Sequence, residues 1–232
     1  RRSTDLKIAN SDYLLILNPD TIIEEDTLEI LVKYIETNVK IGMVGPKILN
    51  ADGSLQVSCK RSFPSIKSAI PKILGLDKLF PNSKLFGRYN LTFLDPDKNH
   101  VVDAISGSCM LIRNKVFKKI GGFDERFFMF GEDIDICLRT WKANFEVHYF
   151  PETKIIHYKG ESVKTAPYNS REAFYEAMDI YVDKHYSLTL DKISRVLISL
   201  GIRLNKFLSM IIEKKSMILS LFLDSFIITG AF

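Results

Sequence analysis

The sequence is poor in the residues that most often mark a metal site or a disulfide framework. It has three cysteines, four histidines and one tryptophan among 232 residues. Cys59, Cys109 and Cys137 are an odd number at no metal-like spacing, which argues against a cysteine zinc site and against paired disulfides. Each lies in an apolar stretch, so we expect reduced thiols that pack as small apolar side chains, in a protein of the cytoplasm.

The chain also has no large excess of charge of either sign. The formal net charge is +4, and basic residues are interleaved with acidic ones, so nucleic acid is not an expected partner. The first residues, 1–5, are polar with no apolar core behind them, so we expect no signal peptide. With 46% apolar and 26% charged residues, the composition is that of a globular protein with a sizeable core.

Short apolar runs alternate with amphipathic stretches, a pattern typical of an α/β fold. The first run, 13–17, is continuous, so we expect a strand buried on both faces, as in a parallel sheet. A turn at 52–53 predicts a hairpin, and Asn114 is placed to cap a short helix that ends at Gly121-Gly122. Further strands are expected at 41–44, 101–105, 108–112, 147–150 and 154–157, and helices at 24–37, 132–144 and 171–185.

The segment 63–99 interrupts this alternation. It contains Pro64, Pro71, Pro81 and Pro96 together with scattered phenylalanine and leucine. We expect a long excursion with short helices, of the kind that lies over a site.

Three groups of residues could carry chemistry, and the first is Asn18-Pro19-Asp20, directly after the strand expected at 13–17. Ligands of open α/β sheets gather beyond the carboxyl ends of the strands. A carboxylate there can hold Mg²⁺ or Mn²⁺ against a diphosphate, because these cations prefer hard oxygen ligands. The alternative is an ordinary turn, since all three residue types are common in turns.

The second group is the Gly-Glu-Asp-Ile-Asp motif at 131–135, which opens a helix directly after the aromatic segment 127–130. Carboxylates at a helix start stabilise it by about 0.3–1 kcal/mol each, which is the structural explanation. A carboxylate beside apolar walls is also suited to act as a general base. On the residues alone, Glu132 and Asp133 fit both explanations equally well.

The third is His157, at the end of the strand expected at 154–157. A lone histidine at a strand end is more often a core or surface residue than a ligand. A ligand role becomes attractive only together with Asp20 and Asp133. The histidines without such company, which we expect to be structural, are His100, His148 and His185.

The order of these segments resembles glycosyltransferase family 2, most closely its bacterial rhamnosyltransferase-like branch. The matching segments are the strand ending in Asn-Pro-Asp-Thr at 18–21, Gly-Ser-Cys-Met-Leu-Ile-Arg-Asn at 107–114, Gly-Gly-Phe-Asp-Glu at 121–125, Phe-Met-Phe-Gly-Glu-Asp-Ile-Asp at 128–135, and Ile-Ile-His at 155–157. The resemblance covers 5–186, and 121–139 is its most specific part. It implies an α/β fold of the GT-A type, a Rossmann-like mixed sheet flanked by helices.

Carried over residue by residue, the resemblance implies that Asp133 is the catalytic base and that Asp20 and His157 bind the metal. It also implies that Glu132 and Trp141 contact the acceptor. The residues implied to bind the donor are Asn18, Asp20, Gly107 and Ser108. Asn18 stands where the family usually has a first aspartate, which leaves Asp20 as the main ligand.

The implied reaction is the inverting transfer of a sugar from a nucleotide-diphosphate sugar to a glycan or lipid-linked acceptor in cell-surface polysaccharide synthesis. Mg²⁺ or Mn²⁺ is the implied cofactor, and rhamnose is the first candidate for the sugar. We expect Asp133→Asn to abolish transfer with little change in folding. The alternative is a non-catalytic sugar- or nucleotide-binding module of the same fold. It gains weight because we expect the family's N-terminal nucleoside-binding segment to be missing before Asp5.

We divide the chain into a partial GT-A domain, 1–187, and a basic, apolar helical tail, 188–232. The last apolar stretch, 216–232, is shorter than the ~20 residues that a membrane span needs. A peripheral contact with an anionic membrane and packing on the domain or a partner are the two interpretations of the tail. The first places the protein in the cytoplasm at the inner face of the cell membrane.

Overall fold

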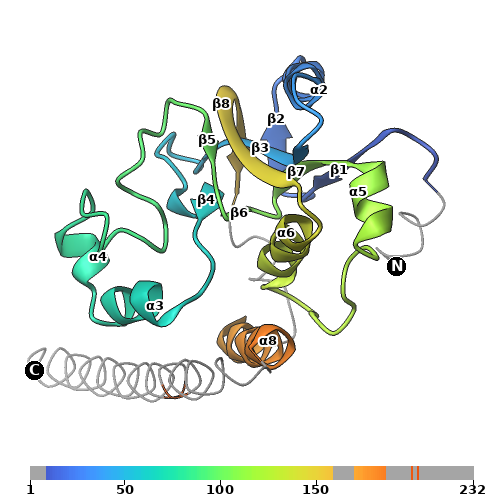
Figure 1. Ribbon diagram of the computed structural model, residues 1–232. Helices are drawn as coiled ribbons and strands as arrows, with labels where there is room; N and C mark the ends of the chain where they lie inside the picture. Colours follow the sequence, from blue (N-terminus) through green and yellow to red (C-terminus); the bar gives the residue numbers. More distant parts are fainter. Residues whose placement is uncertain (1–8, 159–169, 187–199, 201–202, 204–232) are drawn as a thin grey trace, which may run out of the picture.

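The computed structural model describes residues 9–158, 170–186, 200 and 203. The strands of its main sheet are β1 (Tyr13–Leu17), β2 (Thr21–Ile23), β3 (Ile41–Leu49), β5 (His100–Val101), β7 (Cys109–Arg113) and β8 (Glu146–His157). They form a six-stranded sheet in the order β1-β7-β3-β8-β2, with β5 also pairing with β8 (Figure 1). A second, two-stranded sheet consists of β4 (Lys60–Arg61) and β6 (Ala104–Ile105). The α/β fold expected from the sequence is confirmed.

The sheet is mixed rather than parallel. β3 and β8 run parallel, whereas β7 is antiparallel to both β1 and β3, and β2 is antiparallel to β8. The strand at 13–17 is therefore confirmed, but its expected burial on both faces in a parallel sheet is wrong. β1 pairs antiparallel with β7 at the edge of the described sheet, and of its five residues only Leu14 is buried.

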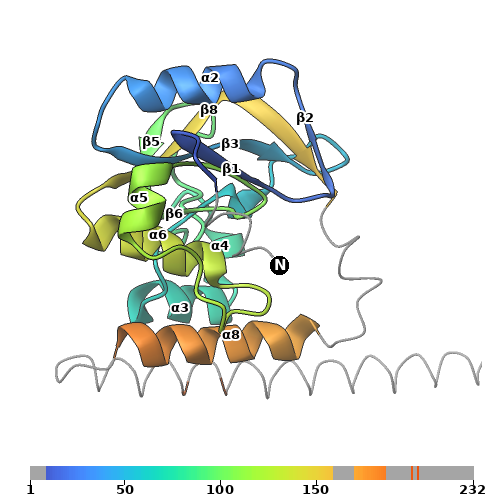
Figure 2. The same ribbon diagram turned by 90° about the vertical axis from the view of Figure 1, so that its right-hand side faces the viewer.

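Helices flank the sheet on both faces (Figure 2). One face is covered by α2 (Thr27–Glu36), which buries Leu31 and Ile35 completely. The helices α5 (Asn114–Lys119) and α6 (Glu132–Lys142) lie on the other face, where Ile136 and Cys137 of α6 are fully buried. The helix expected at 24–37 begins only at Thr27, because the acids before it form the approach to the helix and Asp26 is the N-cap.

The two strands expected at 147–150 and 154–157 are one continuous strand, β8. Its pairing with β3 shifts between Pro46, which faces Phe150, and Lys47, which faces Lys154. The bulge accommodates Pro151, which has no N–H to donate to a ladder. A sequence pattern interrupted by proline thus marks an irregularity within the strand and not the gap between two strands.

Asn114 does not cap the helix that follows it. It is the first residue of α5, and its Nδ2 donates to the carbonyl oxygens of Ala9 and Ser11 at 3.1 and 2.6 Å. The side chain therefore fastens the segment before β1 to the end of β7. The predicted end of the helix is confirmed, because Gly121 has a left-handed φ of 79°.

The turn at 52–53 is confirmed, with Gly53 at a φ of 81°. The hairpin around it is short, since the described ladder consists of a single bridge between Leu49 and Leu55. The helix expected at 171–185 is present as α8 (Ser170–His185). It packs against α6 through Ala177 and Tyr181, which form a buried cluster with Phe127 and Ile134.

The excursion at 63–99 contains short helices, as expected, and they are α3 (Ile66–Ile73) and α4 (Leu76–Leu79). A reciprocal pair of hydrogen bonds between Ser65 and Ser68 caps α3. The two ends of the excursion meet where the N–H of Ser62 donates to the carbonyl oxygen of Tyr89 at 2.8 Å. The segment therefore leaves the end of β4 and returns to the same place.

All three cysteines are free and buried, as expected. Burial raises the pKa of the Cys109 thiol and of the Cys137 thiol to about 12, so both remain protonated and unreactive at neutral pH. In the described ranges no helix is long and apolar enough to cross a membrane. The predicted tail, 188–232, lies outside the described residues apart from Leu200 and Arg203.

Lys60 of β4 is 1% exposed, and its ammonium group lies 5.3 Å from the centre of the Tyr149 ring. Burial lowers the pKa of Lys60 below its ordinary value of 10.5. Because the folded pKa is depressed, the cost of charging Lys60 is present at pH 7 and disappears as the pH rises through the folded and then the unfolded pKa. We expect Lys60→Met to raise the free energy of unfolding by about 1–2 kcal/mol at pH 7.

Thermal unfolding of Lys60→Met beside the wild type, at pH 7 and near pH 10.5, measures this effect. The gain in unfolding temperature should shrink at the higher pH. Lys115→Met, which alters an exposed lysine of α5, is the control and should change little at either pH. An unfolding temperature below that of the wild type at pH 7 would contradict the prediction.

Candidate functional site

Three segments that are far apart in the sequence meet at one end of the main sheet. The N–H of Asn18, just after β1, donates to the carbonyl oxygen of Ser108 at 2.9 Å. The N–H of Gly107 donates to Oδ2 of Asp133, at the start of α6, at 3.1 Å. β2 pairs with the end of β8, where Thr21 faces His157. The loop 106–108 thus connects the Asn-Pro-Asp motif to the acidic start of α6.

Asp20 and His157 lie next to one another. Oδ1 of Asp20 is 3.4 Å from Nε2 of His157, and Nδ2 of Asn18 is 3.5 Å from the same nitrogen. Both side chains of the Asp20–His157 pair are about nine-tenths buried, at 12% and 10% exposed. Strand pairing brings Asp20 and His157 to this position, because β2 begins one residue after Asp20 and pairs with the last three residues of β8.

Gln56 holds the imidazole of His157 from the other side, and nothing in the sequence pattern pointed to it. Its amide Nε2 donates to Oδ1 of Asn50 at 3.1 Å, which leaves Oε1 facing Nδ1 of His157 at 3.0 Å. The carbonyl oxygen can only accept, so Nδ1 carries the proton. In the neutral imidazole the lone pair is then on Nε2, the nitrogen beside Asp20, which is the arrangement that metal-binding histidines usually have.

This donor set fits a hard divalent cation. One carboxylate and one imidazole nitrogen converge, with the Asn18 side chain beside them. Mg²⁺ and Mn²⁺ are commonly bound by one or two protein ligands together with substrate phosphates and water. Over the part of the chain that the structure describes, no group of three or more His, Cys, Asp or Glu side chains could hold a metal ion.

Asp133 is held by polar partners. Its Oδ2 accepts hydrogen bonds from the N–H of Gly107 and from Arg61, and its Oδ1 accepts from the N–H of Ile134 at 2.8 Å. The aromatic walls expected around it lie elsewhere. Phe127 packs into the cluster between α6 and α8, and Phe128 is 76% exposed.

Arg61 is a further residue that the sequence analysis missed. It leaves β4 with its side chain 13% exposed and forms an ion pair with Asp133, while one guanidinium nitrogen also donates to the carbonyl oxygen of Ile105 at 3.2 Å. Burial alone lowers the pKa of Arg61, but the Asp133 carboxylate raises it above its ordinary value. The guanidinium therefore remains charged and fixes one face of the Asp133 carboxylate.

Gly107 lies tightly against the start of α6. A β-carbon at this position would be 3.2 Å from Cβ of Asp133, a closer approach than most side chains make. The neighbouring Ser108 is 3% exposed, and its hydroxyl lies 3.0 Å from that of Ser106. Of the two residues implied to contact the donor sugar, Gly107 therefore positions Asp133, and Ser108 accepts the backbone hydrogen bond from Asn18.

Trp141 is not brought together with the other predicted site residues. It lies eight residues beyond Asp133 on α6, about 12 Å along the helix axis. Its indole N–H donates to the carbonyl oxygens of Val102 and Asp103, both at 3.2 Å, and its ring packs against the main core. Glu132, in contrast, lies beside Asp133, with Oε1 3.7 Å from where a Gly107 β-carbon would be.

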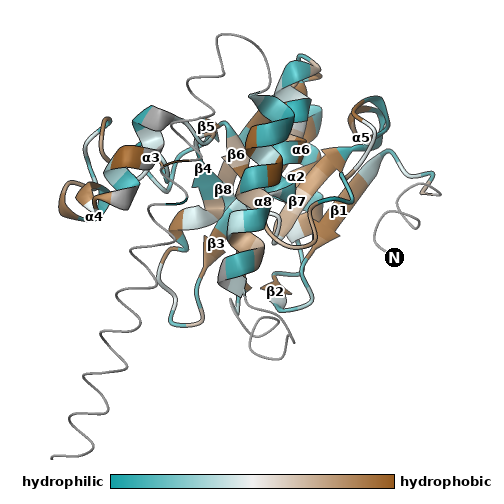
Figure 3. Ribbon diagram, turned by 90° about the horizontal axis from the view of Figure 1, so that it is seen from below, coloured by the Kyte–Doolittle hydropathy of each residue, from teal (hydrophilic) through white to brown (hydrophobic). Residues whose placement is uncertain are grey.

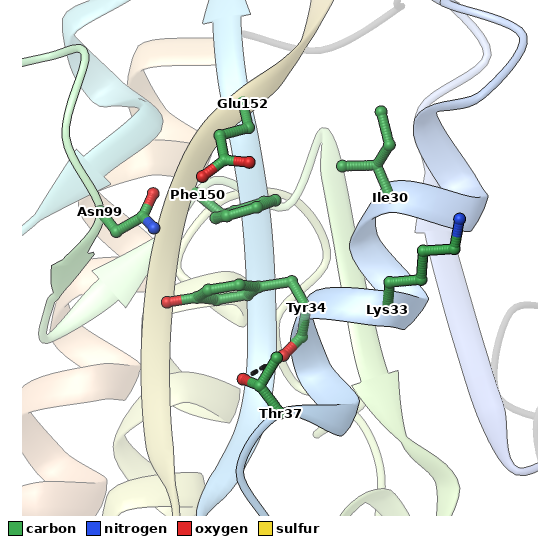
Figure 4. A pocket seen from close by; sticks show the side chains of 7 residues that line it. All are labelled: Ile30, Lys33, Tyr34, Thr37, Asn99, Phe150 and Glu152. Atoms are coloured by element: carbon green, nitrogen blue, oxygen red, sulfur yellow. Dashed lines mark hydrogen bonds between the residues drawn. The ribbon is translucent and has the colours of Figure 1, made fainter.

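A separate pocket of about 330 Å³ lies between α2 and β8 (Figure 4). Its floor is the Tyr34 ring stacked on Phe150, with ring centres 3.8 Å apart. Around them Figure 4 shows Lys33, Thr37 and Glu152. Of the described residues that line it, none belongs to the predicted site, so this pocket is separate from Asp20, Glu132 and Asp133.

The mixed sheet flanked by helices, with an acid–histidine pair and a second acid at one end, defines an α/β domain of the GT-A type. Residues 3–172 match the sequence model of the family described as "Glycosyltransferase like family 2". The chain belongs to this family, and the resemblance identified from the sequence is confirmed.

Similar proteins include two named rhamnosyltransferases. An N-acetylglucosaminyl-diphospho-decaprenol L-rhamnosyltransferase of Mycobacterium tuberculosis is 30% identical over 175 residues, which cover 75% of this chain and 56% of the relative. Rhamnosyltransferase WbbL of Escherichia coli is 34% identical over 152 residues, 65% of this chain and 53% of the relative. The chain thus spans about half the length of these relatives. Among solved structures, S. aureus TarS 1-349 with UDP-GlcNAc is 17% identical with a TM-score of 0.48, covering 89% of this chain and 52% of that one.

Proposed function

We propose that residues 1–187 form the catalytic and acceptor-binding part of a metal-dependent, inverting glycosyltransferase. It would transfer a sugar from a nucleotide-diphosphate sugar to a glycan or lipid-linked acceptor in cell-surface polysaccharide synthesis. The observation that carries the proposal is the convergence of Asp133 with Asp20 and His157 across the loop 106–108. The relatives named as rhamnosyltransferases support rhamnose as the first sugar to test.

The proposed reaction is a single displacement. The acceptor oxygen bonds to the anomeric carbon while the bond from that carbon to the diphosphate breaks, and the configuration inverts. Asp133 takes the proton of the acceptor hydroxyl. Oδ2 already accepts from two donors, so Oδ1, with one, is the oxygen assigned to receive the proton. No described side chain needs to form a covalent intermediate.

The other residues position the two substrates. Asp20 and His157 would hold Mg²⁺ or Mn²⁺, which when bound stabilises the charge of the leaving diphosphate. Arg61 and Gly107 hold the Asp133 carboxylate in one orientation. Glu132, beside it on α6, is assigned to the acceptor hydroxyls.

The experiment that tests this proposal is metal-dependent release of nucleotide from dTDP-, UDP- and GDP-sugars. It uses the chain within its complete protein, with and without added Mn²⁺, and with polyprenyl-diphosphate and glycan acceptors. Release that requires both a metal and an acceptor supports the transferase. Binding of donor and metal without release to any acceptor would favour the non-catalytic binding module.

Gln56 gives a graded test of the metal site. We expect Gln56→Leu to raise the Mn²⁺ concentration for half-maximal nucleotide release about 10- to 100-fold, because the imidazole of His157 loses the partner that fixes its tautomer. Gln56→Glu keeps an acceptor for Nδ1 and should restore most of the affinity. Equal metal affinity in the wild type and Gln56→Leu would show that Gln56 plays no part in metal binding.

A further inference from the structure

The part of the excursion between 66 and 88 exposes an unusual set of side chains. Its exposed large apolar residues are Ile70, Leu74, Leu79, Phe80 and Leu85. Soluble proteins rarely expose so many large apolar side chains on one short segment unless that segment contacts a partner. In Figure 3 the ribbons of α3 and α4 include several residues coloured as hydrophobic, and the two helices lie at one side of the domain.

The charges between these apolar residues have one sign. The segment contains five basic residues, and all five are exposed: Lys67, Lys72, Lys78, Lys84 and Arg88. Its one acid, Asp77, has a side chain only 10% exposed and is paired with Lys72 at 3.3 Å. The outer surface of the segment is therefore apolar and cationic, without an exposed carboxylate.

This surface is joined to the candidate active site by short connections. α3 begins five residues after Arg61, the ion-pair partner of Asp133. At the base of the excursion the N–H of Phe63 donates to Oδ2 of Asp103 at 3.0 Å, next to the Ser62–Tyr89 hydrogen bond. A binding partner that docked on α3 and α4 would therefore lie on the same side of the domain as the segment that carries Arg61 (Figure 1).

We propose that this surface, 66–88, docks on a bilayer that contains anionic lipids. Apolar side chains such as Leu79 and Phe80 would enter the boundary between head groups and acyl chains, and the lysines would contact the lipid phosphates. The charge of the surface selects this partner, since a zwitterionic membrane or a neutral protein face would leave four of the five cations, all but the Asp77-paired Lys72, without an opposite charge. The inference rests on the surface alone, and it extends the proposed function by placing the transferase where a lipid-linked acceptor is found.

The test is co-sedimentation of the full chain with vesicles of phosphatidylcholine, with and without phosphatidylglycerol. Each basic residue near an anionic surface contributes about fivefold to binding, so Lys67→Gln/Lys78→Gln/Lys84→Gln should weaken binding to the anionic vesicles roughly 100-fold. The matched control, Lys40→Gln/Lys115→Gln/Lys118→Gln, removes the same charge from exposed lysines outside the segment and should change binding less than about threefold.

The apolar part has its own matched pair, because Leu79 and Val39 are both 71% exposed. Leu79→Ser should weaken vesicle binding about tenfold and Val39→Ser should not. Equal losses in the two triple variants, or binding to anionic vesicles that neither the triple variant nor Leu79→Ser weakens, would overturn the proposal. So would self-association in the absence of lipid that Leu79→Ser abolishes, which would assign the face to a second copy.

No donor or acceptor sugar enters this assay. A failure to bind vesicles would therefore leave the proposed transferase activity standing, and a failure to transfer sugar would leave the membrane surface standing.

Discussion

Asp133→Asn is expected to lower the rate of sugar transfer about 100- to 10,000-fold, because the amide that replaces the carboxylate cannot take a proton from the acceptor hydroxyl. The substitution keeps the shape of the side chain and an oxygen that can accept from the N–H of Gly107 or Ile134. The loss should therefore appear in kcat and not in the donor KM. Initial rates over a series of donor and acceptor concentrations measure both.

The Arg61 ion pair changes what this variant does to stability. The residue types alone predict little change in folding, but Asp133→Asn leaves the Arg61 side chain, which is 13% exposed, without its counter-charge. The free energy of unfolding of Asp133→Asn is therefore expected to fall by about 1–3 kcal/mol. Loss of activity in this variant alone could then reflect partial unfolding.

A double variant separates the two effects. Arg61→Met with Asp133→Asn removes the unpaired charge and should recover most of the lost stability, while transfer stays as low as in Asp133→Asn. Thermal unfolding and nucleotide release are measured on both. Transfer in the double variant close to the wild-type rate would show that Asp133 is not the base.

The fold was predictable where the signal is local. The helix α6 follows from the spacing of its apolar residues, and the Asp135–Arg139 pair, 2.7 Å apart across one turn, follows from the same periodicity. Asn114 shows the limit of local reasoning, because a helix cap and a donor to Ala9 and Ser11 require the same residue type. Only the position of β1 beside β7 decides between them.

The site was predictable only in part, for the same reason. Asp20, Asp133 and His157 belong to segments whose order resembles a known family. Gln56 and Arg61 lie outside those segments. Gln56 contacts His157 across 101 residues of sequence, and Arg61 contacts Asp133 across 72. Their roles depend on which face of the hairpin and of β4 turns toward the site, and a pattern of residue types along one strand does not contain that information.

The second large effect is expected at Asp20. Asp20→Asn keeps the size of the side chain but removes the carboxylate that lies beside Nε2 of His157. We expect the Mn²⁺ concentration for half-maximal nucleotide release to rise about 100-fold or more, since the charge of the ligands sets much of the affinity for a hard cation. Mn²⁺ binding followed by electron paramagnetic resonance gives a readout that does not depend on turnover.

Asp26→Asn is the matched control for Asp20→Asn. It makes the same change six residues further on, at an exposed aspartate whose side chain forms no capping hydrogen bond. Both variants lose one negative charge from the same region, so a general electrostatic effect on cation binding would weaken them equally. Binding that weakens only in Asp20→Asn places the metal between Asp20 and His157. If Mn²⁺ binds Asp20→Asn as tightly as the wild type, the cation is held elsewhere, and the Asp20–His157 pair is a structural contact that ties β2 to the end of β8.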